Sequence, residues 1–592
     1  MNTILKSRQA WPVLGGLLFC WAFFLWAAGR GFDFADDSFF LLMTANPNAF
    51  PWVTNFGDIL HPLYIALGGS IVGFRIAGAV LLTICVVPFA WGLSRFLGGR
   101  EVSQTFHITL LAVCACVFWQ YDTWYPTPNY NLLDLCGLLL FFAGLLMATP
   151  SVDTGVSDAG DYGAAAIAAA LAGIGLTVMV LVKATTAASA GALGLVWLLF
   201  LRPRHSLFSV AIAAAISASL VGAAILTIDG SVAVFLAGKS VALAEMKALD
   251  ANGDLHGIAS SITRPFSSEL WKLMQSLPFL ATMLALGFGW CWVTVTASRP
   301  TPRRQVASYA IAALFAVMVG WWRSIALEGG PVKGYHAWYV AMLVLFLILA
   351  GFVAWTLRSR IGRQQHRLLI GVIILAAAPI SYAFGTDGVL ILHAGSACVF
   401  WVAAMLATAF LLPDAWRPHL LMGTAFLVTV VTVGMLAGTM ITPGHVGAPL
   451  WKQTEEIEIG ALPARIRVEP AMAEYVQALQ QGAKAHGFEP GMPIVDLSGA
   501  GPGMMFALGG RPVGAPWLHI QFSRGADLPT MYLNRAPKSQ SHSAWLITGD
   551  DVDLARSVLK SQGINWPADY EEAGRAERPD KEWKQILWKP RG

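Results

Sequence analysis

Thirteen apolar stretches run through the first three quarters of the chain and constrain its fold more than any other feature. A helix that crosses the hydrocarbon core of a bilayer needs about 20 predominantly apolar residues, so each stretch predicts one membrane span. We therefore expect a polytopic α-helical membrane protein with about 13 transmembrane helices, and a single water-soluble domain is excluded. The spans are expected near residues 11–29, 74–97, 105–121, 131–148, 163–182, 184–201, 206–228, 273–297, 306–326, 337–357, 367–383, 389–411 and 419–441.

Charged residues are distributed unevenly along the chain. Only 12% of the 592 residues are charged, whereas soluble globular proteins carry about 25%. Residues 1–442 hold 23 Lys and Arg and 18 Asp and Glu, while the 150 residues 443–592 hold 16 and 17. This contrast predicts a transmembrane catalytic domain over 1–442, with a first outer loop at 30–73 and another at 229–272, followed by a soluble α/β domain over 443–592.

Net charge and cysteine positions exclude several classes of protein. The formal net charge is +4, and the Lys and Arg residues are scattered among apolar spans without forming a basic face, so nucleic acid is not an expected partner. All seven cysteines fall inside apolar stretches without metal-ligand spacing, and residues 443–592 contain none. Disulfide bonds and a zinc site are therefore not expected.

The orientation in the membrane follows from the positions of Lys and Arg, which are enriched in cytoplasmic loops. Clusters at 299–304 and 358–363 indicate cytoplasmic loops if the N-terminus is also cytoplasmic. The loop 149–162, which carries three Asp and no basic residue, disagrees, although acidic residues count little in this rule. We retain the first span as an anchor rather than a signal peptide. Residues 443–592 are then periplasmic, in a multi-pass protein of the bacterial inner (plasma) membrane.

The first predicted outer loop contains the acids Asp33, Asp36 and Asp37 within the sequence Gly-Phe-Asp-Phe-Ala-Asp-Asp-Ser-Phe-Phe. Neighbouring carboxylates repel, so such a run needs a cationic partner, a metal ion or a bound proton. A solvated acidic loop is the alternative interpretation, and the four surrounding phenylalanines disfavour it. We expect Asp36 and Asp37 to be catalytic, with Asp33 in support.

Other polar residues are expected at the same outer face. The stretch 62–97 is too long for one span, so its first part predicts a surface helix that leads to Arg75. Lys183 lies between two spans with almost no loop, where an ionisable group is usually functional, unless its side chain reaches water from the span end. The loop 229–272 has mixed charge and predicts an ordered or gating loop. Candidate substrate-binding or supporting residues on this face are Asp33, His61, Tyr64, Asp122, Asn129, Tyr130, His336 and Asp387.

Carboxylates opposite cations at a membrane surface fit one chemistry well. A carboxylate can take a proton from an acceptor hydroxyl while cations stabilise a departing phosphate. Lys183, Arg75 and Arg323 are the expected phosphate-binding residues. Water-soluble nucleotide sugars are not expected outside the cytoplasm, so the donor would be a sugar linked to a polyprenyl phosphate.

At this point the chain resembles the GT-C superfamily of membrane glycosyltransferases, which includes bacterial aminoarabinose transferases and protein O-mannosyltransferases. The resemblance rests on Asp36-Asp37 soon after the first span, on His61-Pro62 leading to Arg75, and on thirteen spans followed by an outer domain. It covers about residues 11–440 in layout. Asp-Asp stands where relatives often have Asp-Glu, and we cannot match every phosphate-binding cation.

The resemblance implies an inverting transfer of a monosaccharide from a polyprenyl-phosphate donor to a glycolipid, polysaccharide or protein acceptor. It makes Asp36 the expected general base, Asp37 a positioning or metal-binding partner, and Asp122 the acid of the second outer loop that some relatives have. No cofactor is certain. A divalent cation, Mg²⁺ or Mn²⁺, held by Asp36 and Asp37 is left open.

Residues 443–592 read as a small α/β domain. Helical spacing predicts a helix over 470–486 and another over 553–561, while short apolar runs predict strands at 493–497 and 543–548. The glycine-rich turn at 499–503 after the first strand could hold a phosphate, but a structural turn that faces the membrane domain is the preferred interpretation. Five tryptophans could stack on sugars or fill the core.

Two other functions remain open from the sequence. A membrane transporter or lipid flippase is the main alternative, although such proteins place ionisable residues near the membrane midplane and often have repeated halves. A scaffold for envelope assembly would leave the three acids and Lys183 without a role.

Overall fold

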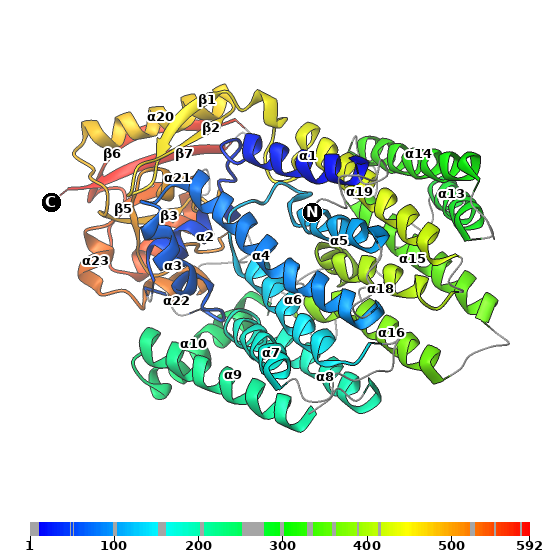
Figure 1. Cartoon of the computed structure of the whole chain (residues 1–592). Helices are drawn as coiled ribbons and strands as arrows, with labels where there is room; N and C mark the ends of the chain where they lie inside the picture. The colour runs from blue at the N-terminus through cyan, green and yellow to red at the C-terminus, as the bar shows by residue number, and fades with distance from the viewer. Residues whose placement is uncertain are drawn as a thin grey trace.

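The structure of the protein is a computed structural model, shown in Figure 1. It describes residues 11–47, 49–50, 52–98, 104–151, 162–201, 206–250, 277–295, 301–327, 336–357, 363–386, 390–412, 416–520, 527–549, 552–579 and 583–591.

Long apolar helices make up most of residues 11–441, which identifies a polytopic helical membrane protein. Eight segments of the described chain are long and apolar enough to cross a membrane. They lie in α4 (Ile71–Gly98), α6 (Tyr130–Ala148), α7 (Tyr162–Val182), α8 (Ala184–Leu201), α9 (Ser206–Ile228), α14 (Pro302–Leu327), α16 (Arg363–Ala383) and α19 (Arg417–Ile441).

The other five predicted spans coincide with apolar helices whose described side chains cover a shorter stretch, so a count of thirteen spans stays a prediction. One of them, predicted at 389–411, is divided into three pieces where Gly395 packs against the ring of Tyr339. These five spans correspond to α1 (Trp11–Ala27), α5 (Gln104–Cys116) with η1 (Val117–Tyr121), α13 (Leu277–Val295), α15 (His336–Leu357), and α17 (Leu390–Ala394) with η3 (Gly395–Ala397) and α18 (Val399–Ala409).

The first outer loop contains two short helices, α2 (Asp36–Ala45) and α3 (Phe56–Ala66). The expected surface helix is therefore present, but it begins before His61 and a second helix precedes it. Gly68 and Gly69 adopt positive φ angles, a conformation that side chains with a Cβ disfavour, and they turn the chain from α3 into α4. In the second outer loop, α10 (Val232–Asp250) follows α9 directly.

Residues 455–590 form the predicted C-terminal α/β region. A hairpin of β1 (Glu455–Ile459) and β2 (Ala464–Val468) precedes a five-stranded sheet of order β4-β3-β5-β7-β6, in which β4-β3-β5 are parallel and β5-β7-β6 antiparallel. All four predicted elements are present. The remaining elements are η4 (Leu450–Lys452), α20 (Pro470–Ala485), β3 (Pro493–Leu497), α21 (Gly503–Ala507), β4 (Arg511–Pro512), α22 (Asp527–Leu533), α23 (Lys538–His542), β5 (Trp545–Thr548), α24 (Val552–Ser561), β6 (Tyr570–Arg578) and β7 (Trp583–Pro590).

The C-terminal region packs directly on the first outer loop, so both lie at the same end of the helical region, as Figure 1 shows. The backbone N–H of Gly31 donates to the carbonyl of Arg467 at 2.8 Å, and the N–H of Arg467 donates to Gly29 at 3.0 Å. Phe34 lies against Gly503, where a Cβ would come within 2.4 Å of the Phe34 carbonyl oxygen. The glycine-rich turn thus allows close contact with the membrane region, which confirms the structural interpretation of that turn.

Candidate active site

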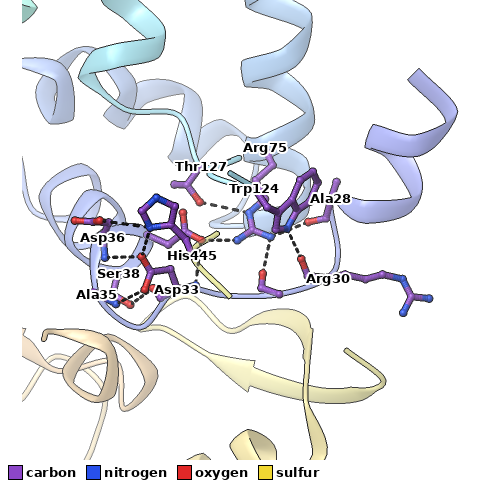
Figure 2. Close-up of polar contacts among 12 residues, drawn as sticks. Ala28, Arg30, Asp33, Ala35, Asp36, Ser38, Arg75, Trp124, Thr127 and His445 are labelled. Carbon is purple, nitrogen blue, oxygen red and sulfur yellow. Dashed lines mark hydrogen bonds and ion pairs between the residues drawn. The ribbon is translucent and has the colours of Figure 1, made fainter. Parts of the chain in front are cut away.

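Asp33 sets the geometry of the acidic loop because its carboxylate accepts two backbone N–H groups where the chain enters α2. One carboxylate oxygen accepts the N–H of Ala35 at 2.9 Å, and the other accepts the N–H of Asp36 at 3.1 Å (Figure 2). A side-chain acceptor at this position satisfies backbone donors that a helix leaves unpaired in its first turn. Asp33 is itself buried. It therefore supports Asp36 by fixing the turn that presents it.

Asp37 faces inward and forms a buried ion pair with Arg75. Its Oδ2 lies 2.8 Å from Nη2 of Arg75, and neither side chain has more than 2% of its surface exposed. The same guanidinium also donates to the carbonyls of Ala28 and Gly31, each at 3.0 Å, and to Thr127 (Figure 2). Burying a charge is costly unless it is paired and hydrogen-bonded. These contacts tie the outer loop to the head of α4.

Asp36 faces the opposite way, beside His445, which follows the last predicted span. The Asp36 side chain is 39% exposed, and its Oδ2 lies 3.8 Å from Nδ1 of His445. The same nitrogen lies 3.5 Å from Oδ2 of Asp33. The His445 ring also packs on Tyr125, with ring centroids 4.7 Å apart. Figure 2 shows the imidazole between the two carboxylates.

The charges of this cluster shift the pKa values of its members. Burial alone would lower the pKa of His445, but the hydrogen bond to Asp33 and the charges of Asp33 and Asp36 outweigh it and raise that pKa. Burial would raise the pKa of Asp33, yet His445 and the two backbone donors hold it below its usual value. Burial, followed by the charge of Asp36, raises the pKa of Tyr125, which therefore remains a neutral hydroxyl.

The same three residues, Asp33, Asp36 and His445, are the group in the described chain whose ligand atoms could hold one metal ion. These atoms lie within 4.8 Å of one another. Two carboxylates with an imidazole suit a divalent cation such as Mn²⁺. Asp37, for which a metal shared with Asp36 was left open, is paired with Arg75. In the present arrangement both oxygens of Asp33 already accept backbone hydrogen bonds.

Lys183 lies between α7 and α8 and has a polar environment of its own. Its ammonium donates to the carbonyl of Tyr382 and to the hydroxyl of Thr386, and lies 3.9 Å from the carboxylate of Asp134. Thr186 donates to the same carboxylate at 2.8 Å. Lys183 is 9% exposed and Asp134 is fully buried. This lysine is therefore held in place and does not simply extend to water.

Two of the remaining predicted residues have structural roles: one caps a helix and the other joins two helices. The amide oxygen of Asn129 accepts the N–H groups of Asn131 and Leu132, so Asn129 caps α6. His61 is hydrogen-bonded through Nδ1 to the carbonyl of Thr44 at 2.8 Å, which joins α3 to the end of α2.

Three further predicted residues lie among packed side chains. Tyr64 is buried against Phe74, and Tyr130 packs on Phe40. Asp122 is buried at the end of η1, where its backbone carbonyl accepts the hydroxyl of Thr439.

Three predicted residues are only partly described or not described. Arg323 lies in α14 and His336 begins α15, but their side chains are outside the described part of the structure. Asp387 lies outside the described residues altogether.

Sequence reasoning missed His445 and Asp134, which lie beside the predicted residues Asp33 and Lys183, and Lys239, which donates to Asn55 of the first outer loop. His445 could have been found, since it follows the last span and must emerge at the same face as Asp36. Asp134 lies only four residues after Tyr130 in a predicted span, where a lone acid needs a partner. Lys239 carried no pattern that distinguishes it from the other charges of its loop.

Comparisons with known proteins give one likeness. No protein-family model matches the chain, and no curated protein matches it. The chain is similar to a solved structure, ArnT from Cupriavidus metallidurans bound to undecaprenyl phosphate, with a TM-score of 0.44 and 14% identity over 98% of each chain. A TM-score this low leaves the family of the chain undecided, so the functional proposal depends on the residues themselves.

Proposed function

We propose that the protein is an integral-membrane glycosyltransferase that moves a monosaccharide from a polyprenyl-phosphate donor to an acceptor of the cell envelope. The observation that carries the proposal is the division of labour between Asp36 and Asp37. Arg75 fixes the buried Asp37, whereas the neighbouring Asp36 presents an accessible carboxylate at the end of the helical region where the C-terminal region packs. This geometry supplies a rigidly held base that a membrane-bound substrate can reach.

In the proposed reaction, Asp36 accepts the proton of an acceptor hydroxyl as that oxygen attacks the anomeric carbon of the donor sugar. The bond from the anomeric carbon to the phosphate oxygen breaks, and the polyprenyl phosphate leaves with the electron pair. Attack from the face opposite the leaving group inverts the anomeric configuration. The acceptor can be a glycolipid, polysaccharide or protein.

Positive groups near the phosphate would stabilise the departing charge. Lys183 and Arg323 are retained as phosphate-binding candidates. Arg75 was expected to share that role, but its full burial and its pairing with Asp37 favour a positioning role. His445, which the sequence analysis did not identify, is proposed to orient the Asp36 carboxylate.

A divalent cation, Mg²⁺ or Mn²⁺, would be held by Asp33, Asp36 and His445 rather than by Asp36 and Asp37. Such an ion would supply positive charge close to the donor phosphate. Removal of divalent cations with a chelator tests this assignment, because transfer that continues at the full rate would exclude it.

The proposed membrane orientation keeps the N-terminus in the cytoplasm and the site in the periplasm. Contact between the first outer loop and the C-terminal region supports a common side for both. Labelling of single cysteines introduced at exposed positions, such as 553, with a membrane-impermeant reagent tests the orientation.

The experiment that tests the function is a comparison of envelope glycans by mass spectrometry. A deletion strain is complemented with wild type, Asp36→Asn or the control Asp553→Asn, which alters an exposed carboxylate of α24. We expect one sugar to be absent in the deletion strain, restored by wild type and the control, and not restored by Asp36→Asn. Full restoration by a folded Asp36→Asn protein would reject the proposed base.

A transporter or lipid flippase remains the second candidate because of the Asp134–Lys183 pair, since buried ionisable pairs between membrane helices also line transport pathways. Movement of an unmodified lipid-linked sugar in proteoliposomes, with no product formed, would favour it.

A further inference from the structure

A cavity of about 230 Å³ lies between the first outer loop and the corner that joins α9 to α10. A buried water needs about 10–15 Å³ of such space, so the cavity has room for a ligand well over ten waters in size. This is enough for a monosaccharide ring and too little for a polyprenyl chain. The polar residues that line the cavity are Asn46, Thr54, Asn55, Asp58, Asp229 and Lys239.

The position of the cavity relates it to the candidate active site. Met43, which lines it, lies in α2 seven residues after Asp36, and a helix rises about 1.5 Å per residue, so about 10 Å of helix separates the two. On the other side, the N–H of Asn55 donates to the carbonyl of Leu181 at 2.9 Å, two residues before Lys183. The cavity therefore adjoins both the helix that carries the proposed base and the segment that leads to the proposed phosphate-binding lysine.

The cavity also reaches the end of a candidate membrane span. Ile228, the last residue of the candidate span in α9, is part of its wall. Val234, Phe235, Gly238 and Lys239 line the opposite side from α10. These positions recur at helical spacing and so share one face of α10.

The charges of the lining argue against a phosphate as its occupant. Lys239 is the basic residue among the lining residues, and its ammonium already donates to the carbonyl of Trp52 at 2.9 Å and to Oδ1 of Asn55 at 2.7 Å. Asp58 and Asp229 supply two carboxylates, which leaves the lining with a net negative charge. An anion would be repelled from such a surface.

The same lining suits a sugar. Phe50, Trp52 and Phe235 provide aromatic faces for the C–H groups of a sugar ring. A carboxylate accepts hydrogen bonds from hydroxyls, and an amide group both donates and accepts them. Oδ2 of Asp229 is buried without a hydrogen-bond partner in the described structure. A buried acceptor without a partner is costly, so a hydroxyl that reaches it would be bound.

We propose that this cavity is a monosaccharide subsite. In it, Asp229 accepts a hydrogen bond from a sugar hydroxyl, and Lys239 fixes the lining segment of Trp52 and Asn55 through its hydrogen bonds to both residues. The inference rests on the proposed transferase function and extends it to the group that is recognised. The ring belongs either to the donor or to a glycan acceptor, because both present the same hydroxyl chemistry. The experiment below distinguishes these two sources.

Gly238 offers a way to fill the cavity without changing a charge. A Cβ at Gly238 would meet no atom within 4 Å, and the residue lies within α10, where leucine is a better helix former than glycine. Gly238→Leu should therefore fold and occupy the space. Gly222 is a matched control, because it lies within α9, has equally open space, and does not line the cavity.

The test measures transfer by purified Gly238→Leu, Asp229→Asn, Gly222→Leu and Asp36→Asn proteins, with the lipid-linked sugar and acceptor that the glycan comparison identifies. We expect Gly238→Leu and Asp229→Asn to raise either the KM for the donor or the KM for the acceptor about tenfold. Gly222→Leu should keep both wild-type KM values. A higher KM for the donor, with unchanged inhibition by sugar-free polyprenyl phosphate, assigns the subsite to the donor sugar. A higher KM for the acceptor alone assigns it to the acceptor.

The two proposals fail in different ways. Absence of transfer by the wild-type protein would overturn the proposed function, and full activity of Asp36→Asn would overturn the role of Asp36 as the base. Loss of activity in Asp36→Asn, together with wild-type KM values for Gly238→Leu and Asp229→Asn, would overturn the subsite alone.

Discussion

Asp36 and Asp37 are adjacent in the sequence, yet α2 places them in opposite environments. Asp37 points into the protein and pairs with Arg75, whereas Asp36 is 39% exposed beside His445. The first side chain is committed to structure and the second is available for chemistry. The comparison shows that an acidic pair does not have to act as a unit, because one acid can hold the loop from which the other acts.

The largest expected effect is a loss of stability when the buried acid, Asp37, is changed. Asp37→Asn leaves the Arg75 guanidinium buried without a counter-charge, and loss of one partner of a buried pair costs about 3–5 kcal/mol. Thermal unfolding in detergent should show a strong loss of stability. The double variant Asp37→Leu with Arg75→Met should recover much of it, because no uncompensated charge remains. An unchanged unfolding temperature for Asp37→Asn would contradict the structural role.

The contact between the C-terminal region and the acidic loop can be broken at Gly503. A Cβ there would come within 2.4 Å of the Phe34 carbonyl oxygen, and overpacking of this kind costs about 1–3 kcal/mol. We expect Gly503→Ala to reduce both stability and transfer, since the loop that carries Asp36 must move. Gly574→Ala is the matched control, because its nearest contact would be an ordinary 3.5 Å. Equal behaviour of the two variants would show that docking does not position the loop.

Variants of Asn129 distinguish its role as a helix cap from a role in substrate binding. Asn129→Ala removes the acceptor for two N–H groups of α6 and should cost about 1 kcal/mol of stability. Asn129→Asp keeps the acceptor but loses the hydrogen bond from Nδ2 to the carbonyl of Thr127, so it should recover only part of the stability, and the transfer rate should follow the unfolding temperature in both variants. A stable but inactive Asn129→Asp protein would instead indicate that the amide binds substrate.

The smallest effect is expected from the partly exposed His445, and it should depend on pH. The raised pKa of His445 stabilises the folded protein below the unfolded value of about 6.5, and this contribution is lost as pH rises through the folded pKa. The lowered pKa of Asp33 contributes above about pH 4 and is lost as pH falls through its folded value. His445→Gln should therefore reduce the unfolding temperature most between about pH 4 and 6.5. A difference from wild type that does not vary with pH would contradict the pairing.

The elements of the fold could be predicted largely because the periodicity of the sequence reports burial directly. The strand at 493–497 and the helix from Pro470 were predicted at their observed starts, since each has apolar residues at the spacing of its element and a clear boundary residue. The helices α2 and α10 were not predicted as helices. Their stability comes from contacts with distant segments, such as the packing of α2 on α3 and α21, which local pattern does not contain.

The candidate site could be located but not resolved from the sequence. Topology brought Asp33, Asp36, Asp37 and Arg75 to one face, and the structure places them together. Which acid is exposed depends on the rotation of α2, which Asp33 and Arg75 fix through three-dimensional contacts. The partner of Asp33, His445, lies 412 residues away in the sequence, and the partner of Lys183, Asp134, lies 49 residues away. No local motif could therefore reveal these two pairs.

The most direct test of the account is the transfer rate of purified Asp36→Asn measured together with its unfolding temperature. Loss of a positioned general base reduces rates about 10²- to 10⁴-fold, while an exposed neutral substitution should leave the unfolding temperature close to that of wild type. The account predicts a stable protein that transfers no more than about 1% of the wild-type amount. A stable Asp36→Asn protein with the wild-type rate would contradict the central claim that Asp36 is the base.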